Sequence, residues 1–106
     1  MDAPEPVVAD LEAMVEVAEK GIVSKAIVEN EHHKIILFTL APGQELSEHT
    51  ASVPAVIHVL SGRGRVVLGG VEHEAGMGKL YYMPAEYRHA VQADEELSFL
   101  LTMFRT

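Results

Sequence analysis

Two segments of this chain, each bounded by Gly or Pro and each carrying a histidine, constrain its fold most strongly. The first runs over residues 42–64, PGQELSEHTASVPAVIHVLSGRG, and contains His49. The second runs over residues 78–89, GKLYYMPAEYRH, and ends at His89. In both segments strand-forming residues surround the histidine, as expected where a strand passes the mouth of a β-barrel. The pattern therefore predicts that His49 and His89 lie together at one end of a barrel, with the rest of the chain as its wall.

The chain after Gly21 consists of short strand-like runs separated by turn residues, which is typical of an all-β sandwich or barrel. Ser61–Gly64 is a hairpin signal, and Gly69-Gly70 suits the positive φ angles of a tight primed turn. The predicted strands cover residues 22–28, 34–40, 55–60, 65–68, 80–83, 89–92 and 97–104.

The N-terminal part has a different pattern, with apolar residues at three- and four-residue spacing between residues 7 and 20. This spacing predicts a short amphipathic helix that packs on the barrel. Asp10 is the expected N-cap and Gly21 the expected stop signal. A strand over part of residues 14–17 is the alternative.

Length and composition exclude several classes of protein. A chain of 106 residues that is 48% hydrophobic is expected to form one domain with a full core. We therefore expect a tail and short helix in residues 1–20 and a single barrel domain in residues 21–106. The net charge of −8 disfavours nucleic acids and anionic membranes as partners, and no apolar run approaches the roughly 20 residues of a membrane span. The acidic N-terminus is unlike a secretory signal, so we expect a cytoplasmic protein.

Two of the predicted strands are apolar on both faces, KIILFTL at residues 34–40 and LSFLLTMF at 97–104. One face of such a strand can fill the barrel, whereas the other must be covered by the helix or by a second subunit. We therefore expect a homodimer with sheet-to-sheet or strand-exchange contacts.

The two histidine segments also match a pair of family motifs. Their matching residues are Gly43, His49 and Gly62 in the first segment and Gly78, Pro84 and His89 in the second. At this spacing and in this order they resemble the two signature motifs of the cupin superfamily, which are small jelly-roll barrels. The resemblance implies an RmlC-like, double-stranded β-helix barrel, here with a short N-terminal helix.

Metal-binding cupins hold one divalent transition metal with three histidines and a glutamate. In this chain the resemblance places His49 and His89 on two of those four positions, but Ala51 and Ala55 on the other two. Any metal that binds here is therefore expected on His49 and His89 alone. Two imidazoles are fewer than the three protein ligands that catalytic metal sites usually keep.

The leading hypothesis for function is a cupin that binds a small molecule in its barrel at a degenerate metal site. The expected pocket residues are His49, His89, Tyr82, Ile57 and Val59. The two alanines motivate this hypothesis, because they remove charge and leave room.

Two alternatives stay open. One is an enzyme, either metal-dependent and dioxygenase-like, or a metal-free isomerase with His89 as base and Tyr81 or Tyr82 as acid. The other is an inert barrel that is packed shut by Ile57, Val59 and Met103.

The remaining candidate ligands have weaker claims. Period-2 alternation predicts that His58 faces outward, and His73 is expected to be exposed on an edge strand. We expect His32 and His33 in a solvated turn and Glu86 as a turn glutamate.

Overall fold

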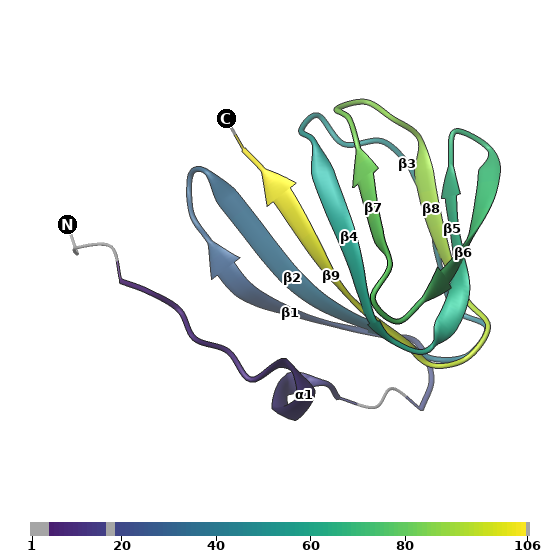
Figure 1. Cartoon of the computed structure of the whole chain (residues 1–106), viewed down its shortest axis with the longest axis horizontal. Coiled ribbons are helices and arrows are strands. Elements are labelled where there is room, and N and C mark those ends of the chain that lie inside the picture. The colour runs from purple at the N-terminus through teal and green to yellow at the C-terminus, as the bar shows by residue number, and fades with distance from the viewer. Residues whose placement is uncertain (1–4, 17–18, 106) are drawn as a thin grey trace.

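Two antiparallel sheets make up most of the computed structural model, which describes residues 5–16 and 19–105 (Figure 1). Strands β1, β2, β9, β4 and β7 lie side by side in that order in one sheet, and β3, β8, β5 and β6 in the other. The predicted all-β jelly-roll barrel, with a short N-terminal helix, is confirmed. The elements are α1 (Leu11–Met14), β1 (Ile22–Glu29), β2 (His33–Leu40), β3 (Glu45–His49), β4 (Ala55–Ser61), β5 (Arg63–Leu68), β6 (Val71–Gly76), β7 (Leu80–Met83), β8 (His89–Ala93) and β9 (Leu97–Phe104).

Each of the seven predicted runs is a strand, and their ends differ from the prediction by at most two residues. Gly69 and Gly70 have φ angles of +57° and +85°, as the predicted primed turn requires. The turn expected over Ser61–Gly64 is shorter, because only Gly62 separates β4 from β5. Strands β3 and β6 are not among the seven runs. Their residues are mostly polar and exposed, so they carry little apolar alternation.

The helix α1 is a single turn, much shorter than the helix expected over residues 7–20. Asp10 is its N-cap as predicted, because its side-chain Oδ1 accepts a hydrogen bond from the backbone N–H of Ala13 at 3.3 Å. The backbone is already extended at Val15. Lys25 of β1 donates from Nζ to the carbonyl of Met14 at 2.9 Å, which satisfies a free helix-end carbonyl and fixes where the helix stops. Gly21 is therefore not the stop signal.

Residues 1–4 of the predicted tail and residues 17 and 18 of the predicted helix lie outside the described residues. Within the described ranges, no helix is long and apolar enough to cross a membrane.

The core fills the space between the two sheets. Phe99 of β9 stacks on Phe38 of β2 with ring centroids 5.3 Å apart. Burying a large apolar side chain contributes about 1.5–3 kcal/mol, so this cluster supplies most of the stabilisation. Its most buried members include Leu40, Ala55, Ile57, Val59, Val66, Met83, Val91, Leu97 and Phe99.

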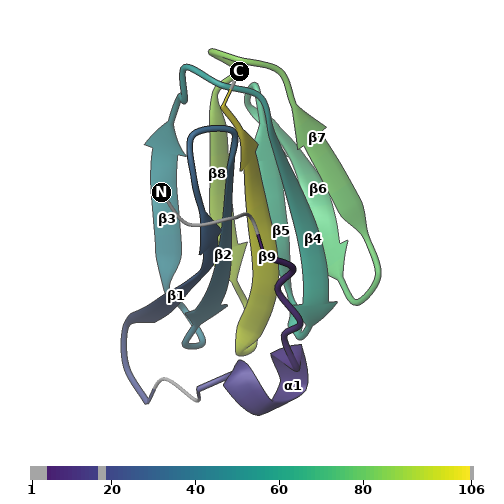
Figure 2. The same ribbon diagram turned by 90° about the vertical axis from the view of Figure 1, so that its left-hand side faces the viewer.

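The outer face of the five-stranded sheet is covered along part of its length by the N-terminal segment. Figure 2 shows this segment passing in front of β9, with α1 at its lower end. On β2 and β9 Leu37 is buried, and Thr39 Oγ1 and Ser98 Oγ lie 3.1 Å apart in a buried hydrogen bond. The second apolar face of β2 and β9 is thus partly covered within the chain itself.

Candidate functional site

The structure brings His49 and His89 together, as the sequence predicts. His49 ends β3 and His89 begins β8, and the two residues are directly paired across these antiparallel strands. Their ring centroids lie 4.2 Å apart with an interplanar angle of 63°. A register shift between Leu46 and His49 marks a β-bulge, a feature that re-aims the side chain after it. We call these two residues the histidine pair.

The histidine pair lies at the end of the barrel where the β3–β4 and β7–β8 loops meet, which we call the open end (top in Figure 2). The backbone N–H of Glu86 joins the two loops by donating to the carbonyl of Ala51 at 2.7 Å. His89 is only 5% exposed, whereas His49 is exposed to solvent. A ligand can therefore reach the pair from the His49 side.

Backbone carbonyls set the proton position on both rings. His49 Nδ1 lies 2.7 Å from the carbonyl oxygen of Ser47, and His89 Nδ1 lies 2.9 Å from that of Tyr87. A carbonyl oxygen only accepts, so each Nδ1 carries the proton. In the neutral rings each Nε2 then carries a free lone pair. The site can accept two hydrogen bonds or offer two ligands to a metal.

The other two family metal positions offer no ligand. Ala55 is buried at the start of β4, and Ala51 lies in the β3–β4 loop. Across residues 5–16 and 19–105, no group of three His, Cys, Asp or Glu side chains is placed to hold a metal ion. The backbone contacts of the two Nδ1 atoms are those typical of metal-ligating histidines, but the donor set is one short of the usual three. We derive no reaction step through a metal.

The other expected pocket residues do not gather around the histidine pair. Tyr82 faces outward and is 56% exposed, whereas Tyr81 is the inward-facing tyrosine. Tyr81 Oη donates to the backbone carbonyl of Glu74, and burial, with the nearby Glu74 charge, raises the pKa of Tyr81 above its usual value of 10.0. Ile57 and Val59 are packed into the core.

The weaker candidates lie away from the site. His58 is exposed on the outer face of β4, and His73 is exposed on the edge strand β6. His32 and His33 lie where β2 begins, and their backbone N–H groups donate to the side chain of Asn30. His58, His73, His32 and Glu86 lie as expected, whereas His33 is the first residue of β2 rather than part of the turn before it.

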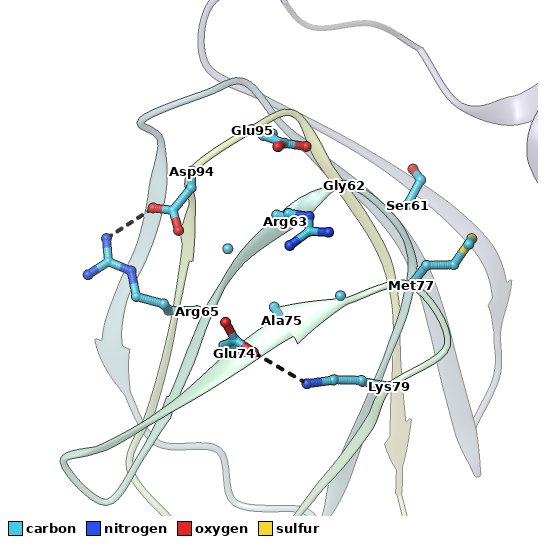
Figure 3. Close-up of a pocket in the computed structure, with 12 residues that line it drawn as sticks. Ser61, Gly62, Arg63, Arg65, Glu74, Ala75, Met77, Lys79, Asp94 and Glu95 are labelled. Carbon is cyan, nitrogen blue, oxygen red and sulfur yellow. Dashed lines mark hydrogen bonds and ion pairs between the residues drawn. The ribbon is translucent and has the colours of Figure 1, made fainter.

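The surface of the described residues has two hollows that neither His49 nor His89 lines. The first, of about 780 Å³, lies at the opposite end of the barrel and is lined by charged side chains from β5, β6 and the two connections that follow β6 and β8 (Figure 3). The second, of about 480 Å³, lies between the β1–β2 turn and the C-terminal end of β9. The first hollow was not predicted from the sequence, although Arg63 and Arg65 on either side of Gly64 were a signal for it.

Comparisons with known proteins agree with this architecture. The cupin domain family matches residues 36–103, which is more than half of the chain. A search of the curated proteins finds no match.

Solved structures similar to this chain have varied descriptions. An RmlC-like cupin from Desulfovibrio desulfuricans is 28% identical, with a TM-score of 0.77 and coverage of 99% of this chain and 97% of that one. A conserved protein of unknown function from Streptococcus pyogenes is 26% identical, with a TM-score of 0.86 and coverage of 98% and 91%. A salicylate 1,2-dioxygenase from Pseudoaminobacter salicylatoxidans is 18% identical, with a TM-score of 0.75 and coverage of 79% of this chain and 25% of that one. At this identity the likeness shows only a shared fold. The motif spacing, the two-sheet barrel and the family match together show that this chain belongs to the cupin family.

Proposed function

We propose that this cupin binds a small molecule at the open end of its barrel through His49 and His89. The observation that supports this function is the pair of Nε2 lone pairs, which the two Nδ1–carbonyl hydrogen bonds leave available. Such acceptors suit a ligand with an O–H or N–H donor. Since Ala51 and Ala55 add no charge, the rest of the ligand is small and largely apolar.

The proposed ligand contacts the open end rather than the barrel interior. Ile57 and Val59 are almost fully buried in the core, together with Phe99. A close-packed core of this kind leaves no room for a molecule of the usual ligand size. The exposed ring of His49 is the accessible part of the site.

The metal-dependent enzyme is the second candidate, supported by the same Nδ1–carbonyl contacts. It requires one divalent transition metal and a third ligand from substrate or solvent. The metal-free isomerase has less support, because Tyr82 faces outward and the hydroxyl of Tyr81 is already bonded to the Glu74 carbonyl.

A thermal-shift screen of small phenols, carbonyl compounds and hydroxy acids tests the binding proposal. We expect hits that raise the Tm of the unaltered protein and are lost in both His49→Ala and His89→Ala. His73→Ala is the matched control, because His73 is an exposed histidine on the edge strand β6, away from the histidine pair. Hits that persist in both His49→Ala and His89→Ala contradict the proposal, as does a broad screen without hits.

Metal content measured by elemental analysis of the same proteins separates the binding protein from the metal-dependent enzyme. Near-stoichiometric metal that is lost in His49→Ala favours the enzyme.

We also propose that the chain acts as a cytoplasmic homodimer through sheet-to-sheet contact. The part of the five-stranded sheet's outer face not covered by the N-terminal segment is apolar, and Leu80 and Tyr82 on it are 62% and 56% exposed. Strand pairing places no acidic side chain there, although the chain carries 16 acids. The residues of this face on β4, β7 and β9 are Val56, His58, Leu80, Tyr82, Leu100, Thr102 and Phe104.

An uncharged apolar face allows two copies of a chain with net charge −8 to meet without repulsion at the contact. Sedimentation velocity is expected to give a dimer for the unaltered protein and a monomer for Tyr82→Glu. A monomer for both contradicts this proposal.

A further inference from the structure

The hollow at the end of the barrel opposite the histidine pair has the features of a second site. It is lined by the ends of β4, β5 and β6 and by the β6–β7 and β8–β9 connections, and its volume is about 780 Å³. Its small residues include Gly64, Ala75 and Gly76, and charged side chains surround them (Figure 3). We call it the closed-end hollow.

Most of the charges around the closed-end hollow are already paired. Arg65 lies 3.2 Å from Asp94 and 3.4 Å from Glu72. Lys79 Nζ lies 4.0 Å from the Glu74 carboxylate. Arg65 therefore has two carboxylates beside it and Lys79 has one.

Arg63 and Glu95 are different. Neither side chain has an ion pair or hydrogen bond with another described residue. Figure 3 shows the Arg63 guanidinium in the middle of the closed-end hollow. The backbone N–H of Glu95 donates to the carbonyl of Arg63 at 3.0 Å, so the two residues are neighbours at the hollow. One unpaired cation and one unpaired carboxylate therefore line the same hollow.

We propose that the closed-end hollow binds a small zwitterion, an α-amino acid or a molecule of similar charge pattern. The planar guanidinium of Arg63 matches a carboxylate in a two-pronged contact, and the carboxylate of Glu95 accepts from the ammonium group. A simple anion is disfavoured, because Glu95, Glu74 and Asp94 all lie around the hollow. The site is open to solvent, so we expect a dissociation constant in the millimolar range.

Gly76 offers a way to fill the hollow without damaging the fold. A Cβ added at Gly76 would meet no heavy atom within 4 Å, and its φ angle is not in the left-handed region. Gly76→Val therefore places methyl groups in the open space while β6 keeps its conformation.

The test uses three probes that differ by one charged group: L-alanine, propionate and ethylamine. Binding is followed by NMR through the backbone amides of residues 61–65, 74–79 and 94–95. We expect L-alanine to shift these signals saturably and propionate and ethylamine to bind at least about tenfold more weakly. Arg63→Met, Glu95→Gln and Gly76→Val are each expected to weaken L-alanine binding about tenfold or more.

Arg88→Gln is the control, since it removes an arginine from the other end of the barrel, where Arg88 lies 3.6 Å from Glu48. The Tm of each variant reports its folding separately. Absence of saturable shifts with L-alanine overturns the proposal. Equal binding of propionate and L-alanine, unchanged in Glu95→Gln, overturns the zwitterion and leaves an anion site. Full affinity in Gly76→Val places the binding elsewhere and also overturns it.

Discussion

Two glycines on paired strands are expected to respond in opposite ways to the same substitution. A Cβ built at Gly64 of β5 lies only 2.1 Å from the backbone oxygen of Gln92 on β8, whereas a Cβ at Gly76 of β6 meets nothing within 4 Å. An ordinary carbon–oxygen contact is more than 1 Å longer than 2.1 Å, so Gly64→Ala must push β5 and β8 apart. Overpacking costs about 1–3 kcal/mol, and each weakened strand hydrogen bond adds about 0.5–1.5 kcal/mol. We expect Gly64→Ala to lower the free energy of unfolding by about 2–4 kcal/mol.

Gly76→Ala has no such conflict and reduces the entropy of the unfolded chain, so it is expected to raise the free energy of unfolding by up to about 1 kcal/mol. For a chain of this length, 1 kcal/mol corresponds to roughly 4–5 °C in Tm. Circular dichroism melts should then show Gly64→Ala about 8–20 °C below the unaltered protein and Gly76→Ala level with it or a few degrees above. Neither φ angle is positive, so backbone strain does not enter the comparison. Equal Tm values for the two variants would refute the steric reasoning.

Three further results are expected. Because burial raises the pKa of Tyr81, the stability that the protonated phenol contributes is fully present below about pH 10 and is lost as the pH rises through the folded-state pKa. Urea titrations should show that this alkaline loss in the free energy of unfolding is smaller in Tyr81→Phe but unchanged in Tyr82→Phe, the exposed-residue control. Phe99→Ala should lower the free energy of unfolding by about 3–5 kcal/mol in urea titrations, and a loss below 1 kcal/mol would contradict its place in the core. Lys25→Met should leave the Tm within a few degrees but speed limited proteolysis of the segment before β1. The control Lys34→Met, which removes the 3.2 Å ion pair with Glu29, should not speed this proteolysis, and equal rates for the two variants would contradict the anchoring role of Lys25.

Seven of the nine strands in the described residues and the turn at Gly69-Gly70 were predictable because local sequence determines them. Paired Gly residues require positive φ angles, and the apolar runs of β2 and β9 must be buried wherever they lie. The histidine pair was predictable from the two motifs, since their spacing sets where each strand reaches the open end. None of this required knowledge of distant contacts.

The end of α1 and the direction of the tyrosines depend on such distant contacts. The pattern of apolar residues before Gly21 continues as a helix would, but Lys25 of β1 binds the Met14 carbonyl and the chain leaves the helix there. Alternation shows that Tyr81 and Tyr82 face opposite sides, yet not which side is which. The pairing of Tyr81 with the inward-facing Ile57 decides it.

The sequence could not predict which ring nitrogen of each histidine carries the proton. This position decides which ligands the histidine pair can bind. Each ring bonds through Nδ1 to the carbonyl two residues before it, so the same short-range contact occurs at the end of β3 and at the start of β8. With Nδ1 protonated in both rings, a ligand that donates two hydrogen bonds, or one donor shared between the rings, is favoured over a ligand that only accepts. Methyl ethers of any phenol found to bind should therefore lose most of the affinity, because their oxygen can no longer donate. Equal affinity for a phenol and its methyl ether, measured by calorimetry, would mean that the Nε2 lone pairs do not face the ligand.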